Sequence, residues 1–112
     1  MLQSVTLSAL TSALDGLAER QRAIADNVAN VQTPGYHARR VAFEEQLLGA
    51  VQDGHGDVAP SSARSLEPTR LDGNNVNLDT ETLSNIDTVL RVQLATRAVD
   101  GKFSSVRTAM RS

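Results

Sequence analysis

Two histidines are the first place to look for acid–base or metal chemistry, because the chain contains no cysteine. His37 is followed by Arg39 and Arg40, and cationic neighbours weaken a general base or a metal ligand. His55 lies between two glycines in the stretch DGHGD, and a mobile loop does not preorganise carboxylates around an ion. Neither histidine has another at ligand spacing, and no phosphate-binding, nucleophile-elbow or HExxH motif occurs. The sequence therefore predicts no catalytic, cofactor-binding or metal site, and no enzyme.

The composition of the 112 residues limits the remaining functions. Only Tyr36, Phe43 and Phe103 are aromatic, so a core must come from aliphatic side chains, which favours helices packed on helices. A net charge of −2 argues against a nucleic-acid surface, and the basic clusters Arg20–Arg22 and Ala38–Arg40 are expected to be solvated or to pair with a neighbouring copy. No apolar run approaches the roughly 20 residues of a membrane span. The N-terminus lacks the basic region of a cleavable signal peptide. We expect one all-α domain that binds no nucleic acid and does not span a membrane.

Apolar residues spaced alternately by three and four predict a long N-terminal helix, from about Ser4 to Gln32 within residues 1–32. The seam consists of Leu7, Leu10, Leu14, Leu17, Gln21, Ile24, Val28 and Val31. A stripe this narrow requires a partner to cover it. Gln21 interrupts the seam, either as a tolerated polar residue at a partly open position or as a buried residue that fixes the register.

A second long helix is predicted over residues 76–112, with Asp79 or Thr80 as its N-cap and Glu81 facing the helix dipole. Its seam consists of Val89, Val92, Thr96, Val99, Phe103, Val106 and Met110, broadened by Leu83, Ile86, Leu90 and Leu94. The two seams are similar in length and lie at opposite ends of the chain. An antiparallel, coiled-coil-like pair of helices is the simplest way to cover both.

Between the helices, the pattern over residues 33–51 predicts an elbow, an extended arm and a short amphipathic piece. Thr33 precedes a proline and should be extended, and Pro34 and Gly35 fit the two central positions of a type II turn. The arm begins at Tyr36 and the amphipathic piece at Phe43. Residues 52–75 are rich in Gly, Ser, Asp, Asn and Pro and poor in apolar side chains, so we expect a flexible connector there.

The stretch IADNVANVQTPGYHARRVAFEEQL resembles the N-terminal signature of flagellar basal-body rod and hook proteins. That signature has two asparagines near a helix end, here Asn27 and Asn30, followed by Thr-Pro-Gly-Tyr. The continuation YHARRVAFEEQL and the C-terminal NNVNLDTETLSNIDTVLRVQLATRAVDGKFSSVRTAM resemble the proximal rod members of this family. The similar segments cover most of the chain outside Gln52–Leu71.

The resemblance implies a structural subunit of the bacterial flagellar rod, required for motility. It implies self-assembly with other rod proteins into a helical tube that transmits torque and surrounds the export channel. It also implies contacts with basal-body ring and export-gate components, and type III export without a cleavable signal. The implied location is the basal body, on the periplasmic side where an outer membrane is present. The alternative is a small helical adaptor or export chaperone that binds a partner helix.

The two asparagines have two interpretations. They are three residues apart, so they share a helix face and can bond main-chain groups that the last turn leaves unsatisfied. A purely local helix end explains the proline and glycine, but not an asparagine pair followed by an arm with no core of its own. We therefore favour contact with an adjacent subunit. The residues assigned to it are Asn27, Asn30, Thr33, Pro34, Gly35, Tyr36 and Phe43.

Overall fold

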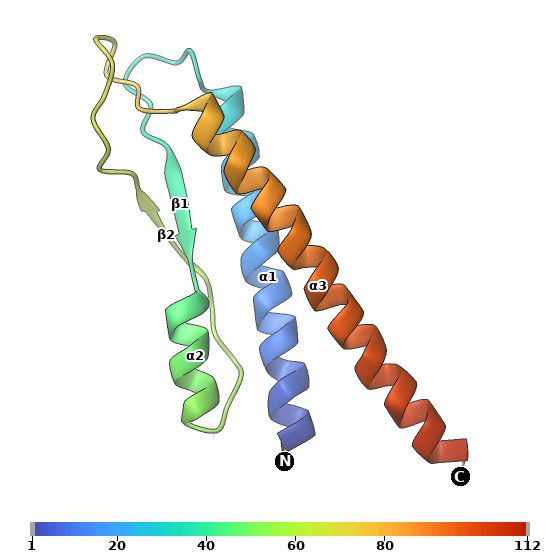
Figure 1. The fold of residues 1–112 in the computed structure, drawn as a ribbon. Coiled ribbons are helices and arrows are strands. Elements are labelled where there is room, and N and C mark those ends of the chain that lie inside the picture. Colours follow the sequence, from blue (N-terminus) through green and yellow to red (C-terminus); the bar gives the residue numbers. More distant parts are fainter. Residues whose placement is uncertain (1, 112) are drawn as a thin grey trace.

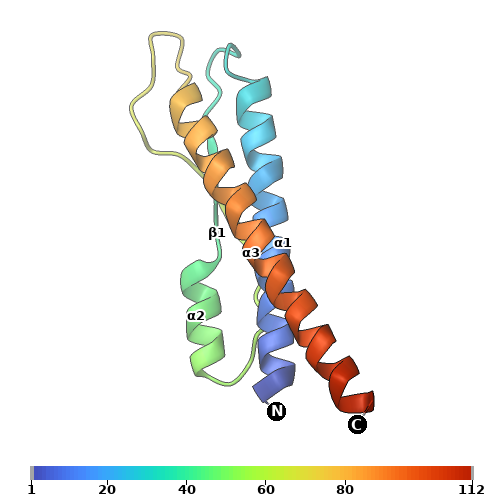
Figure 2. The same ribbon diagram turned by 45° about the vertical axis from the view of Figure 1, so that its right-hand side comes forward.

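Two long helices dominate the computed structural model, which describes residues 2–111, with side chains from residue 5 onward. The elements are α1 (Leu2–Ala29), β1 (Arg39–Ala42), α2 (Glu44–Gln52), β2 (Ser61–Arg64) and α3 (Leu78–Arg111). α1 and α3 contact each other and run in opposite directions, so the first turn of α1 and the last turn of α3 lie at the same end (Figure 1, Figure 2). The body is elongated, with extents of 65 × 25 × 14 Å. The mostly helical fold predicted from the sequence is confirmed.

The ends of the long helices differ slightly from the prediction. α1 ends at Ala29 rather than near Gln32. α3 begins at Leu78, and its N-cap is Asn77 rather than Asp79 or Thr80. The Asn77 carboxamide oxygen accepts the main-chain N–H groups of Asp79 at 2.9 Å and Thr80 at 3.3 Å. These are free donors of the first turn, which an asparagine cap satisfies well.

The all-α prediction is corrected by a two-stranded antiparallel sheet. Within the arm, β1 pairs with β2 in a register that sets Arg39 opposite Arg64 and Ala42 opposite Ser61. All four β2 side chains are exposed, so no alternation of apolar residues marked this strand in the sequence. Main-chain pairing, not side-chain burial, fixes the position of β2.

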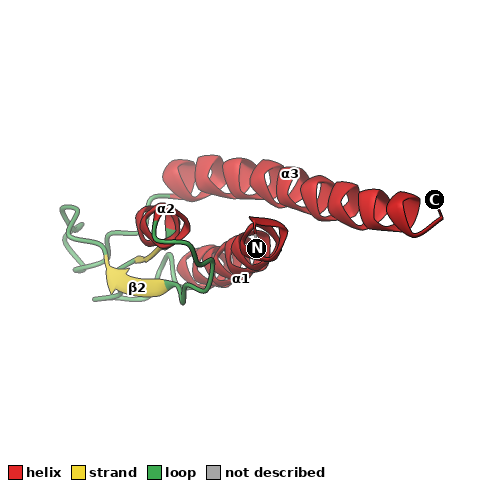
Figure 3. Ribbon diagram, turned by 90° about the horizontal axis from the view of Figure 1, so that it is seen from below, coloured by secondary structure: helices red, strands yellow, loops and turns green. Residues whose placement is uncertain are grey.

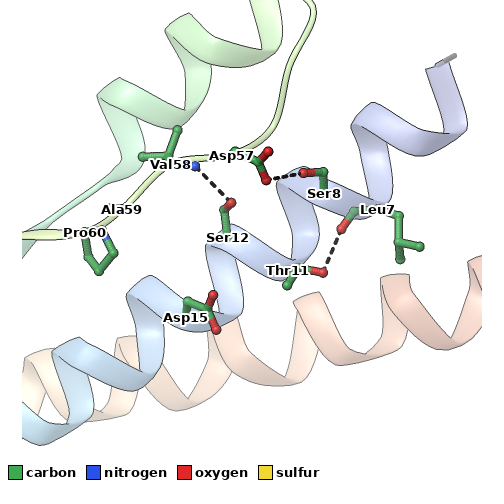
Figure 4. Close-up of a pocket in the computed structure, with 9 residues that line it drawn as sticks. All are labelled: Leu7, Ser8, Thr11, Ser12, Asp15, Asp57, Val58, Ala59 and Pro60. Carbon is green, nitrogen blue, oxygen red and sulfur yellow. Dashed lines mark hydrogen bonds between the residues drawn. The ribbon is translucent and has the colours of Figure 1, made fainter.

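The connector over residues 52–75 is attached to the helices by hydrogen bonds, which its composition did not predict. The Ser12 hydroxyl of α1 donates to the Gly56 carbonyl at 2.5 Å and accepts the Val58 N–H at 3.2 Å. Nearby, Ser8 donates to the Asp57 carboxylate at 2.9 Å, along the side of an open hollow between the loop and α1 (Figure 4). A Cβ at Gly56 would lie 2.4 Å from the main-chain nitrogen of Ala9. Only glycine lets the loop approach α1 this closely.

The small hydrophobic core lies where the arm crosses α1. Leu17 and Ala23 of α1 pack with Val41 of β1 and with Phe43, and Phe43 is only 3% exposed. The Phe43 ring lies against Gly16, where an added Cβ would meet ring carbons at 2.4–2.6 Å. A glycine inside a helix costs about 1 kcal/mol relative to alanine. Here it makes room for the one aromatic ring of the core.

The face that α3 turns toward α1 differs from its predicted seam. The buried residues of α3 are Glu81, Thr88 and Ala95, with Val92 packed against the core. The leucines expected to broaden the seam are exposed: Leu83 by 68%, Leu90 by 55% and Leu94 by 66%. The further seam residues Ile86, Val89, Phe103, Val106 and Met110 are exposed too. Small and polar side chains let α3 approach α1, and most of its apolar stripe is left uncovered.

The predicted seam of α1 is only partly covered. Leu17 and Ile24 are buried, whereas Val28 is 44% exposed. Gln21 is exposed as well, which favours the interpretation of a tolerated polar residue over that of a buried register residue. The other side of α1 is buried beneath the arm and connector, through small residues such as Ser12, Gly16 and Ala23.

Candidate functional site

The Thr-Pro-Gly-Tyr elbow follows α1 and forms the turn that the sequence predicts. The Tyr36 N–H donates to the Thr33 carbonyl at 3.2 Å, and Gly35 has a φ of 75°. With proline at the position before it, this is the geometry of a type II turn. Thr33, Pro34 and Gly35 are all exposed, so the turn forms a protruding surface at the end of the molecule opposite the chain ends (Figure 1).

Asn27 joins three parts of the chain beneath this elbow. Its side-chain amide bonds both main-chain groups of Arg39, donating to the carbonyl at 3.0 Å and accepting the N–H at 2.9 Å. It also donates to the Glu81 carboxylate of α3 at 3.0 Å and accepts the Tyr36 hydroxyl at 3.3 Å. Asn27 is fully buried. The side chain therefore acts inside the subunit, where it fixes the arm and α3 to α1.

Glu81 lies in the first turn of α3, as predicted, and its carboxylate is buried. It is fully buried and accepts an ion-pair hydrogen bond from Arg40 of β1 at 2.6 Å. A buried charge is tolerated only when it is paired and hydrogen-bonded. Arg40 and Asn27 both donate to its Oε1, so the arm and both long helices meet at this oxygen, whereas Oε2 has no hydrogen-bond partner among the described residues.

Asn30 has a local role, unlike Asn27. Its side chain donates to the Asp26 carbonyl at 2.8 Å and accepts the Thr33 hydroxyl at 3.0 Å. These bonds satisfy a carbonyl of the last helical turn and connect that turn to the elbow. Of the two asparagines in the motif, Asn30 therefore stabilises the helix end and Asn27 makes the tertiary contacts.

Two further asparagines, Asn74 and Asn75, hold the elbow from the other side. Asn74 donates to the carbonyls of Asn30 and Thr33, both at 2.8 Å. Asn75 accepts the N–H of Ala38 at 2.7 Å and donates to two carbonyls in the connector. Both side chains are buried. Main-chain groups of the elbow and arm that are not paired in a helix or sheet are thus hydrogen-bonded by these two asparagine side chains.

Arg70 and the turn after it complete this support. The Arg70 guanidinium donates to the carbonyls of Val31 and Val76, both at 2.6 Å. The Gly35 N–H donates to the Asp72 carbonyl at 2.8 Å. The elbow is thus held by side chains from the end of the connector, a region that the sequence pattern marked as flexible.

A separate ion pair fixes the arm further down α1. Arg20 donates to both carboxylate oxygens of Glu44 at 2.7 Å and to the Val41 carbonyl at 2.7 Å, with its guanidinium 5.0 Å from the Phe43 ring centre. The hydrogen bond from Arg20 lowers the pKa of the Glu44 carboxyl, although partial burial opposes that shift. The same bond raises the pKa of Arg20.

The basic clusters are used within the chain. Besides the Arg20 and Arg40 pairs, Arg39 pairs with Asp26 at 2.5 Å and Arg22 pairs with Glu19. Acids of the same subunit lie against these four arginines. Pairing with a neighbouring copy stays a prediction.

The residues assigned to a subunit interface fall into two groups in the structure. Thr33, Pro34 and Gly35 are exposed, and Asn30 and Tyr36 are half-buried. Asn27 and Phe43 are buried within the subunit, so their structural role is to position the elbow and arm. Sequence reasoning missed the contributions of Arg40, Arg70, Asn74, Asn75 and Glu81. The sequence feature that could have indicated Asn74 and Asn75 is the stretch NNVN, in which neighbouring asparagines precede a helix.

Neither histidine contributes a side-chain hydrogen bond to this cluster among those described above. His37 is half-buried in the arm and His55 is exposed in the connector. Over residues 2–111, no group of three His, Asp or Glu side chains is arranged to hold a metal ion. None of the helices in this range has the length and apolar character needed to cross a bilayer.

Comparisons with known proteins agree with the motif. The family described as "Flagella basal body rod protein" matches residues 7–37, which include the seam of α1 and the elbow. The chain is 33% identical to the flagellar basal body rod protein FlgB of Borrelia hermsii, covering 83% of this chain and 86% of that protein. It is 29% identical to FlgB of Escherichia coli (strain K12), covering 89% of this chain and 88% of that protein. With FlgB of Bacillus subtilis (strain 168) it shares 28% identity, over 97% of this chain and 95% of that protein.

Proposed function

Because this chain belongs to the family of flagellar basal body rod proteins named FlgB, we propose that it polymerises with copies of itself and other rod proteins into a helical tube. It is a structural subunit of the flagellar basal body rod. The tube transmits torque and surrounds the export channel, and the subunit reaches it by type III export without cleavage. Ring and export-gate components of the basal body are its further partners. The similarity to rod proteins along most of the chain carries this proposal.

The uncovered apolar surface supports assembly of many copies. α3 exposes a stripe of leucine, isoleucine and valine that neither α1 nor the arm covers. Burial of apolar surface stabilises by roughly 25 cal/mol per Å², so such a stripe favours contact with a neighbour. A narrow, elongated subunit has little core of its own and gains order from such contacts.

Within the family motif, the elbow is the part that we propose contacts an adjacent subunit. Thr33, Pro34 and Gly35 protrude from the end of the molecule, and the asparagine network beneath them holds the turn in one conformation. A surface that is already ordered before binding loses little conformational entropy when it binds. We propose that this turn lies against an adjacent subunit, with Asn27 and Phe43 acting indirectly through the position of the arm.

The double substitution Pro34→Ala with Gly35→Ala tests this role. Alanine is strained at the positive φ of Gly35, so the turn should change shape while both helices persist. We expect nearly unchanged helicity by circular dichroism, together with loss of rod assembly and of motility in a strain that depends on this chain. Equal loss of helicity and assembly would instead assign the elbow a purely local role in folding.

A further inference from the structure

α2 and α3 flank the N-terminal half of α1 (Figure 1, Figure 3). Residues of the three helices line an apolar groove. Its volume is about 520 Å³. The principal apolar residues of its lining are Leu10 and Leu17 of α1, Leu47, Leu48 and Val51 of α2, and Leu94 of α3. Leu48 and Leu94, on its two walls, are 62% and 66% exposed. The groove is therefore open to a partner rather than filled by the subunit itself.

The C-terminal turns of α3 present a matching apolar edge. Phe103, Val106 and Met110 are spaced by three and four, so they lie on one face of the helix. They are 53%, 46% and 82% exposed. α3 diverges from α1 toward the C-terminus, so its last turns stand clear of the other elements (Figure 1, Figure 3). A continuous helix cannot bend back to bring this edge into the groove of its own subunit.

The α2 wall of the groove and the C-terminal turns of α3 carry opposite charges, although Arg91 of α3 also lines the groove, 3.4 Å from Glu44. The segment from Val41 to Ala63, which contains α2, has four acidic residues and no lysine or arginine: Glu44, Glu45, Asp53 and Asp57. The segment from Arg97 to Arg111 has four basic residues and one acid, a net charge of +3: Arg97, Lys102, Arg107 and Arg111 against Asp100. Opposite charges steer two surfaces together and fix their orientation.

The sizes also agree. The eight residues from Phe103 to Met110 span about 12 Å at 1.5 Å per residue, and the nine residues of α2 span about 13 Å. The two-turn apolar edge is therefore about as long as the wall that would cover it. A helix seated in a groove through anchors spaced by three and four is a recurrent mode of recognition.

We propose that the C-terminal turns of α3 in one copy of this chain occupy the α1–α2–α3 groove of a second copy. This inference rests on the proposed function and specifies one contact of the polymer. The contact is heterologous, because one subunit contributes a helix end and the other a groove. Such contacts repeat without closing into a pair, and they build rings or open helical assemblies.

Cysteine cross-linking tests this contact cleanly, because the natural chain has no cysteine. Two variants, Leu48→Cys and Phe103→Cys, carry different tags and are mixed under mild oxidation. A third variant, Leu71→Cys, places the thiol at an exposed leucine outside the groove. We expect the 48–103 product to exceed the 48–48, 103–103 and 71–103 products by at least several-fold. The substitution Glu45→Lys in the groove partner should lower that yield, because it weakens the acidic wall.

The same pairs are then measured in basal bodies isolated from cells that express both tagged variants. Products with no preference for 48–103, or cross-linking of the Leu48→Cys variant only to a different rod protein, would overturn the second-copy assignment. If that happens while the unmodified chain restores motility to a strain lacking it, the docking inference fails and the rod function stands. Failure of the unmodified chain to restore motility would remove the rod function itself.

Discussion

At the scale of single residues, Asn27 and Asn30 have the same side chain but different surroundings. Asn27 is fully buried and bonds the arm and α3, whereas Asn30 bonds its own helix end and elbow. In the sequence, their three-residue spacing places both on one helix face and does not distinguish their roles. The difference arises from the arm, which returns along α1 and places Arg39 against Asn27.

We expect Asn27→Ala to reduce the free energy of unfolding by about 3 kcal/mol, because it leaves two half-buried main-chain groups of Arg39 and the buried Glu81 carboxylate short of partners. Asn30→Ala is the matched control and should cost about 1 kcal/mol or less, since it removes only a local bond at a helix end. Urea denaturation with a constant m-value measures both changes. Equal effects would contradict the division of roles.

The Arg20–Glu44 pair predicts a pH dependence of stability. The pKa of Glu44 is lowered in the folded chain, so the pair stabilises the fold above the ordinary carboxyl pKa. That contribution is lost as the pH falls through the lowered folded-state pKa. We therefore expect Glu44→Gln to destabilise the chain at neutral pH and to match the natural chain in strongly acidic solution. Thermal unfolding of the two chains between neutral and acidic pH measures the difference. A constant gap throughout would contradict this assignment.

At the scale of elements, the two long helices and the type II turn could be predicted, because three-four spacing and Pro-Gly are strong local signals. β2 could not, since its residues Ser-Ser-Ala-Arg show no apolar alternation and its place depends on pairing with β1. The low apolar content of the connector predicts flexibility, but apolar content does not reveal attachment through the polar side chains of Asn74, Asn75 and Arg70.

The orientation of α3 was missed for a related reason. Leucines at seam spacing are expected to face a partner helix, and within one subunit that helix is α1. The structure instead turns Glu81, Thr88 and Ala95 toward α1, because the buried Glu81–Arg40 pair and small side chains set the approach of the two helices. The family motif did identify the correct elbow, but its surroundings come from distant segments.

The contact between α1 and the arm predicts an unusual response to alanine. Gly16→Ala should destabilise the chain by about 1–3 kcal/mol through a clash with the Phe43 ring, outweighing its gain in helix propensity. Gly101→Ala, in an open part of α3, should instead stabilise by up to about 1 kcal/mol. Denaturation midpoints with unchanged m-values measure both. Stabilisation by both substitutions would show that the ring is not held against α1.

At the scale of the whole molecule, an elongated body with an uncovered apolar stripe should change its state with concentration. We expect Leu83→Gln with Leu90→Gln to alter monomer stability by less than about 0.5 kcal/mol, because both leucines are exposed. The same pair should weaken association in sedimentation velocity across a range of concentrations.

The control pair is Leu66→Gln with Leu71→Gln, two fully exposed leucines of the connector. It removes the same apolar groups without touching α3 and should leave association unchanged. Equal weakening by both pairs would indicate general stickiness. A stable monomer or dimer at every concentration would favour the adaptor alternative.

The elbow and the chain ends lie at opposite tips of the subunit (Figure 1). If every copy points the same way, the two ends of the polymer differ. One end displays the elbows, and the other displays the first turns of α1 and the last turns of α3. An incoming molecule then meets a different docking face at each terminus. Elongation should accordingly be directional, with newly delivered chains adding at a single growing tip.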